Sequence, residues 1–120
     1  MAKENIVKNK SFKFAVRIVN LYKYLCEERK EYVLSKQVLR SGTSIGANIR
    51  EAVNAQSPAD FIHKCSIAQK ECDETLYWLE LLKESKYIDE KEFISVYNDA
   101  EELLKIIRSI ILSSKKIHNS

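Results

Sequence analysis

Residues that bend or break regular structure are scarce in this sequence: its 120 residues include two Gly and one Pro. Both numbers are far below average usage, and the two Gly lie inside helix-like segments rather than in turns. So little turn chemistry argues against a β-rich fold. The chain has the length of one ordinary domain, and 45% hydrophobic residues suffice for a single core.

Long apolar runs are also missing. No run approaches the roughly 20 residues that cross a bilayer, and the N-terminus lacks the apolar segment of a signal peptide. The three Cys are an odd number, which fits a reducing compartment better than a disulfide framework. Cys65 and Cys72 share one helical face but lie about 10 Å apart along the axis, too far for a bridge. We therefore expect a cytoplasmic protein without a membrane partner, in which both are small core residues.

Only two His are present, which gives metal and acid–base chemistry little support. Asp60 and His63 form one acid-x-x-His segment, whereas di-iron bundles need two such segments with Glu, plus carboxylates from the other helices. His118 falls in an expected tail, so no Ser or Cys has an evident base. No Gly-rich phosphate loop exists either. We expect no enzyme: no catalytic, metal-binding or cofactor-binding residues and no small-molecule substrate.

Apolar residues recur at helical spacing in four segments. They predict helices over about 5–29, 32–55, 58–85 and 90–113. Residues 114–120 are expected to form a frayed tail. Four helices with short connections predict an all-α fold, in which residues 1–120 form a single antiparallel up-down-up-down four-helix bundle.

Two helix starts carry capping residues. Ser57 is a good N-cap, Pro58 suits the first helical position, and Asp60 lies where an acid meets the positive helix end. Asp89 can cap the last helix, and Glu92 three residues later completes a capping-box arrangement. The start at Ser57 is the most clearly marked boundary.

The helix over 32–55 is unusually small and polar. Its predicted apolar face comprises Leu34, Val38, Ile45, Ile49 and Ala52, with Ser41, Gly42 and Val53 beside it. Beside this face runs a polar row, consisting of Arg40, Ser41, Ser44, Asn48 and Glu51. The row could line a functional surface or form a hydrogen-bonded ladder at a helix crossing or subunit contact. We favour the ladder because buried polar groups are usually hydrogen-bonded. The spacing of Gly42 and Gly46 permits close helix approach.

Two helices carry a second apolar strip away from the core face. The first apolar strip comprises Phe12, Val16 and Val19. The second apolar strip comprises Ile67, Trp78 and Leu81, interleaved with Glu71 and Glu74. A monomeric bundle needs one apolar face per helix, so we expect the two strips to meet at a subunit interface.

Charge is unevenly distributed although the net charge is only +3. A basic row of Lys10, Lys13 and Arg17, supported by Lys3 and Lys8, follows the outer side of the helix over 5–29. Such a row could contact nucleic-acid phosphates, and an oligomer would multiply each contact. The alternative is a solvated helix face, which is the commoner role of lysine-rich surfaces.

The segment from Gln37 to Ala52, with Ile67-Ala68 and Tyr77-Trp78-Leu79, resembles the bacterial four-helix bundle proteins encoded in intervening sequences of 23S ribosomal RNA genes. The matching positions are Gln37, Ser41, Ser44, Ile45, Asn48, Ile49 and Glu51. The resemblance spans about Phe14 to Ile111. Gly42 and Gly46 depart from it, because Ala is more usual there.

This resemblance implies a ring-shaped homopentamer, and more distantly the basic pentameric accessory protein of diversity-generating retroelements, which works with a reverse transcriptase and RNA. A head-to-tail ring needs two different complementary surfaces per subunit, as the two strips provide. We expect a non-enzymatic oligomeric scaffold whose main partner is itself. The alternative is a ring that binds RNA, or an RNA–DNA intermediate, through the basic row, alongside a nucleic-acid enzyme.

Overall fold

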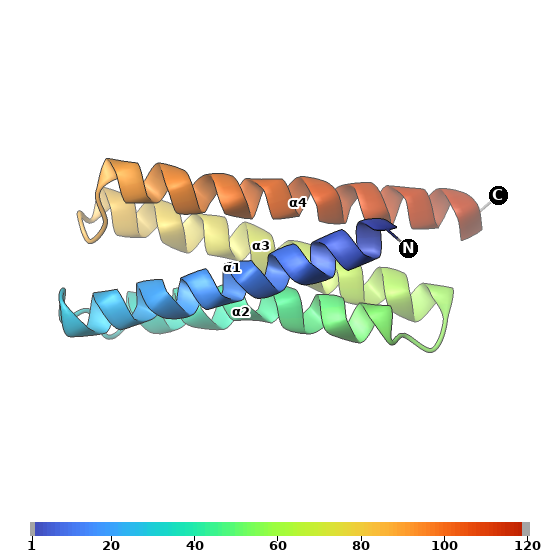
Figure 1. Ribbon diagram of the computed structural model, residues 1–120, viewed down its shortest axis with the longest axis horizontal. Helices are drawn as coiled ribbons and strands as arrows, with labels where there is room; N and C mark the ends of the chain where they lie inside the picture. Colours follow the sequence, from blue (N-terminus) through green and yellow to red (C-terminus); the bar gives the residue numbers. More distant parts are fainter. Residues whose placement is uncertain (1, 119–120) are drawn as a thin grey trace.

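The computed structural model describes residues 2–118 and contains, within that range, four helices and no strand. The helices are α1 (Ala2–Glu27), α2 (Leu34–Val53), α3 (Pro58–Glu84) and α4 (Glu90–His118). They run antiparallel in an elongated bundle of 50 × 22 × 20 Å, with both ends of the chain at the same end of the molecule (Figure 1). The predicted all-α four-helix fold is confirmed.

Each helix packs against two others. α2 contacts α1 and α3, and α4 contacts α3 and α1, so α1 and α3 lie on a diagonal, as do α2 and α4. α1 packs more extensively against α2 than against α4. Figure 1 shows the reason: α1 runs obliquely and approaches α4 at its N-terminal end. Among the described residues, no helix is long and apolar enough to span a membrane.

The core follows the predicted helical faces, with buried residues from all four helices. Ile18, Ile45, Leu79 and Ile107 have no exposed surface. On α4, the buried residues include Val96, Leu103 and Ile110. Val53, which was predicted to lie beside the apolar face of α2, is 42% exposed in the last turn of the helix, whereas its neighbour Ala52 is buried.

Close contact between α1 and α2 depends on the two glycines of α2. A Cβ atom at Gly42 would lie 2.8 Å from Cγ1 of the buried Ile18, and one at Gly46 would lie 3.2 Å from the carbonyl oxygen of Ser11. The first distance is shorter than real contacts allow. The close approach predicted from the glycine spacing is therefore present, and it explains why Ala does not suit position 42.

The predicted caps begin two helices. Asp60 N–H donates to Ser57 Oγ (3.1 Å), and Pro58 occupies the first turn of α3. The N–H of Glu92 donates to Asp89 Oδ1 (2.7 Å) at the start of α4. The Glu92 carboxylate, assigned to a capping box, instead lies 3.7 Å from Arg17.

Glu31 begins α2 in a way the sequence did not reveal. Its carboxylate accepts hydrogen bonds from the backbone N–H groups of Val33 (3.1 Å), Leu34 (3.0 Å) and Ser35 (2.7 Å). These donors are the unpaired amides of the first helical turn. α2 therefore starts at Leu34, two residues later than predicted.

The frayed tail predicted from residue 114 is wrong for the described part of the chain, since α4 continues to His118. No Gly or Pro interrupts this segment. The last turn contains Lys115, Lys116 and His118. Positive side chains stabilise this end of a helix because it carries a partial negative charge. Residues 119–120 of the predicted tail lie outside the described residues.

Candidate functional site

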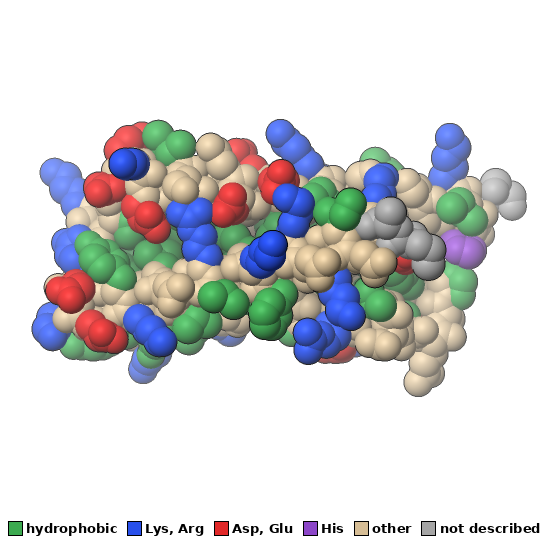
Figure 2. Space-filling model, viewed as in Figure 1, with side chains coloured by type: hydrophobic (Ala, Val, Ile, Leu, Met, Phe, Trp, Pro, Cys, Tyr) green, Lys and Arg blue, Asp and Glu red, His purple; other side chains and the backbone are tan. Residues whose placement is uncertain are grey.

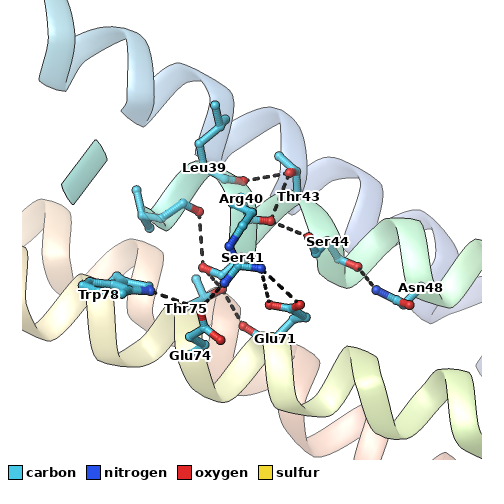
Figure 3. Close-up of polar contacts among 11 residues, drawn as sticks. Leu39, Arg40, Ser41, Thr43, Ser44, Asn48, Glu71, Glu74, Thr75 and Trp78 are labelled. Atoms are coloured by element: carbon cyan, nitrogen blue, oxygen red, sulfur yellow. Dashed lines mark hydrogen bonds and ion pairs between the residues drawn. The ribbon is translucent and has the colours of Figure 1, made fainter. Parts of the chain in front are cut away.

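The polar row of α2 connects this helix to α3 at both of its ends, and Figure 3 shows the end at Arg40. The Arg40 guanidinium donates to Glu71 (3.2 Å) and to Glu74, and Lys64 donates to Glu51 (2.9 Å). Between these ends, Ser44 Oγ donates to the Arg40 carbonyl (2.5 Å) and Asn48 Nδ2 to the Ser44 carbonyl (2.9 Å). The side chains of Ser44 and Asn48 thus bond within their own helix.

Ser41 is the fully buried member of the row. Its Oγ is hydrogen-bonded to Thr75 Oγ1 (3.0 Å), and the Thr75 hydroxyl donates to the Glu71 carbonyl (2.8 Å). Desolvation lowers the pKa of Arg40, but Glu71 and Glu74 outweigh it and raise that pKa above its ordinary value. The hydrogen bond to Glu51 likewise raises the pKa of Lys64. Arg40 and Lys64 are therefore each held in the charged form by an acidic partner on the neighbouring helix.

The second apolar strip lies on α3 beside this network. Trp78 Nε1 is 3.5 Å from Glu74 Oε1, and its ring meets that of Tyr77 edge to face at 5.0 Å between centroids. Tyr77 is 57% exposed, while Ile67, Trp78 and Leu81 are half-buried. The result is an aromatic and aliphatic surface bordered by acids.

The first apolar strip lies on α1 and remains uncovered within the described chain. Phe12 is 58% exposed and Val16 is 47% exposed, while Val19 is half-buried. Phe12 also lines a groove of about 420 Å³ between α1 and α2, whose other walls are Lys8, Ala15, Thr43, Gly46, Ala47, Arg50 and Glu51. The small residues of α2 leave this groove open, and Lys8 and Arg50 make part of its border basic.

The basic row is not the free cationic surface that the sequence predicts. Arg17 donates to Asp99 (2.7 Å) and to Ser95 Oγ (2.8 Å), and Lys10 donates to Glu102 (3.0 Å). Lys3 donates to Ser109 Oγ (2.5 Å). Figure 2 shows the consequence: basic and acidic side chains alternate along the boundary between α1 and α4. Within residues 2–118, Lys8 and Lys13 make no ion pair, and the partner of Lys3 is a hydroxyl rather than an acid.

The groups with catalytic or metal-binding chemistry are dispersed. His63 is exposed, and Asp60 accepts from Gln56 N–H (3.3 Å) as part of the turn before α3. Among the described residues, no three His, Cys, Asp or Glu side chains are grouped to hold a metal. Burial raises the pKa of the Cys65 thiol to about 11 and of the Cys72 thiol to about 12, so both remain protonated at neutral pH.

A sequence model of the 23S rRNA-intervening sequence proteins matches residues 3–109. The chain belongs to the 23S rRNA-intervening sequence protein family. Its fold and sequence are also similar to a crystal structure from Bacteroides thetaiotaomicron, described as a protein of unknown function from the S23 ribosomal protein family. The identity is 62%, the TM-score is 0.90, and the match covers 91% of this chain and 97% of the other. No curated protein matches the chain.

In this 23S rRNA-intervening sequence protein, two features escaped the sequence interpretation. The acids of α4 that pair with the basic row could have been found from the sequence, because Glu92, Asp99 and Glu102 repeat at helical spacing like the cations of α1. The cap by Glu31 is harder to predict from the sequence, because its carboxylate binds backbone N–H groups that lie two to four residues later in the chain. The first apolar strip has exposed side chains at Phe12 and Val16, whereas the second is half-buried and its Trp78 packs against the core.

Proposed function

We propose that the chain is a non-enzymatic scaffold protein that assembles with copies of itself into a head-to-tail ring. The first apolar strip of one subunit contacts the second apolar strip of the next. The observation that carries this proposal is the 58% and 47% exposure of Phe12 and Val16 on α1, while a second apolar strip lies on α3. Apolar side chains of this size rarely stay exposed in adjacent positions without a partner.

The positions of the strips support a ring. α1 and α3 lie on a diagonal of the bundle, so their outer sides face different directions. Two different complementary surfaces produce a heterologous interface, which closes into a ring when the rotation between subunits allows it. The family resemblance suggests five subunits.

Charge supports the same pairing. The groove beside Phe12 is lined by two cations and one acid (Lys8, Arg50 and Glu51), whereas the strip that contains Trp78 is bordered by two acids and one cation (Glu71, Glu74 and Arg40). Opposite charges at the rim of an interface favour the correct partner and speed association. We therefore expect the assembly to form faster at low salt than at high salt.

Substitution of one strip at a time tests the pairing. Val16→Glu and Trp78→Ala should each lower the mass measured by multi-angle light scattering, because each removes one side of every junction. Val33→Glu is the matched control, since Val33 is 69% exposed and lies in the connection before α2. Its mass should stay that of the wild type.

Mixing the two variants distinguishes a head-to-tail junction from a symmetric one. A Val16→Glu chain keeps its α3 surface and a Trp78→Ala chain keeps its α1 surface, so an equimolar mixture should form dimers with one chain of each kind. Wild-type mass for both single variants would contradict the proposal. So would a mixture that remains monomeric while both variants keep the helical circular-dichroism spectrum.

Nucleic-acid binding is a second candidate, supported by Lys8 and Lys13. Both are exposed on α1 without an acidic partner in the described chain. Lys10 and Arg17 are less suited to binding phosphates, since a ligand would have to displace Glu102 and Asp99.

Charge reversal at the two unpaired lysines tests this candidate. Lys8→Glu with Lys13→Glu should abolish retention of structured RNA at low salt while the helical spectrum stays unchanged. Lys23→Glu with Lys36→Glu provides a control of equal charge change on other exposed positions. If both double variants lose RNA binding equally, the loss reflects net charge and not a site at Lys8 and Lys13.

A further inference from the structure

The outer side of α4 carries a regular stripe that the bundle leaves uncovered. Its six residues are separated by four, three, four, three and four positions, and all are exposed: Ile94, Asn98, Glu101, Lys105, Arg108 and Leu112. Alternating steps of three and four are the spacing of a coiled-coil seam. Ile94 is 48% exposed and Leu112 is 69% exposed, so the two apolar members stand at the ends.

The other sides of α4 are occupied by contacts within the bundle. Toward α1, Asp99 and Glu102 bind Arg17 and Lys10. Toward α3, Tyr97 donates to Glu80 (2.7 Å). The stripe lies between these two borders, and Figure 1 shows α4 forming one long edge of the bundle.

The charges in the middle of the stripe are available. Glu101 and Lys105 make no ion pair within residues 2–118. Arg108 has one remote contact, 3.9 Å from Asp73, and both of these side chains are 52% exposed. An exposed pair of this kind contributes little and exchanges readily.

The order of residues along the stripe is complementary to itself. In an antiparallel pair of copies, the first residue lies opposite the sixth, the second opposite the fifth, and the third opposite the fourth. Ile94 then meets Leu112 of the second copy, Asn98 meets Arg108, and Glu101 meets Lys105. Every pair occurs twice, once on each side of the two-fold axis. Apolar residues thus face apolar residues, and the acid faces the base.

We propose that the α4 stripe is a second self-association surface, on which two copies of this chain pair antiparallel about a two-fold axis. The seam is about 27 Å long at a rise of 1.5 Å per residue. It uses neither of the strips assigned to the ring, so it joins two single chains, or two rings face to face. In a ring, each weak contact is repeated by every subunit.

Cysteine cross-linking between mixed chains tests the register. In a Cys26→Ser background, chains carrying Ile94→Cys mixed with chains carrying Leu112→Cys should form a disulfide-linked dimer on mild oxidation. Either chain alone should stay unlinked, because equal positions lie about 27 Å apart along the antiparallel seam. The off-register control mixes Ile94→Cys with Lys105→Cys and should also stay unlinked. Linkage of either chain to itself, or no linkage in the first mixture, would overturn the proposal.

Charge exchange supplies an independent test. Glu101→Lys and Lys105→Glu each place like charges opposite each other twice, and should weaken the α4 contact about tenfold by sedimentation velocity. The double variant Glu101→Lys/Lys105→Glu restores both pairs and should return to the wild-type association. If the double variant associates no better than the single ones, the pairing is wrong. The cross-linking can be repeated with chains that also carry Trp78→Ala, which should not form the ring. The linked dimer should still appear, because the α4 contact does not depend on the ring.

Discussion

Glu31 illustrates how one residue fixes the start of a helix from outside it. The residue is 8% exposed and its carboxylate accepts hydrogen bonds from three backbone N–H groups, which offset the cost of burying an acid. Burial alone raises the pKa of Glu31, but the hydrogen bonds from Leu34, Ser35 and Val33 outweigh burial and lower it below the ordinary 4.5. The ionised form is therefore favoured in the folded protein.

This pKa gives a pH-dependent prediction. A lowered folded-state pKa contributes stability above the unfolded-state pKa of 4.5 and loses it as the pH falls through the folded-state value. Glu31→Gln should therefore lower the free energy of unfolding by about 1–2 kcal/mol at pH 7. In urea titrations, the difference from wild type should shrink below pH 4.5. Glu28→Gln, an exposed neighbour, should change nothing, and an equal loss for both variants would refute the capping role.

The sequence sufficed to predict which residues of each helix face the core, because apolar periodicity determines a helical face. It did not suffice for contacts between charged residues on different helices. Arg17 meets Asp99 across 82 positions, and that contact depends on how far α1 rotates and tilts against α4. The predicted basic row was therefore right as a face of α1 and misleading as a free surface.

At the scale of helices, α1 and α2 approach each other closely where the two glycines of α2 lie. This close approach depends on Gly42, since a methyl group there would overlap the buried side chain of Ile18 at 2.8 Å. The contact between α1 and α4 is different, because ion pairs such as Lys10 to Glu102 connect exposed side chains. α1 is thus anchored by packing on one side and by charges on the other.

The glycine contact yields a stability prediction. Gly42→Ala should lower the free energy of unfolding by about 1–2 kcal/mol, because overpacking outweighs the gain in helix propensity. Gly46→Ala is the matched comparison and should cost less, since its methyl group would meet the Ser11 carbonyl at 3.2 Å. Thermal unfolding measures both. A Gly42→Ala protein more stable than wild type would show that α1 and α2 are not constrained at this crossing.

For the whole molecule, three surfaces enter the two assembly proposals: the exposed first apolar strip on α1, the half-buried second apolar strip on α3 and the exposed stripe on α4. The first two differ from each other, which suits a ring, whereas the third is complementary to itself, which suits a two-fold contact. Under the two proposals, the chain would be a building block for a closed assembly. The polar row between α2 and α3 has a different role, because Arg40 and Glu51 bind partners on α3 and orient the helix that carries Trp78.

Self-assembly is the central claim, and native mass spectrometry of protein purified from cells, with and without nuclease, tests it most directly. A single chain has a mass of 13.9 kDa. We expect a particle of five chains, or of ten where α4 joins two rings, whose mass does not change with nuclease. A mass lost on nuclease treatment would identify bound nucleic acid and favour the second candidate function. A particle of 13.9 kDa under both conditions would contradict the account.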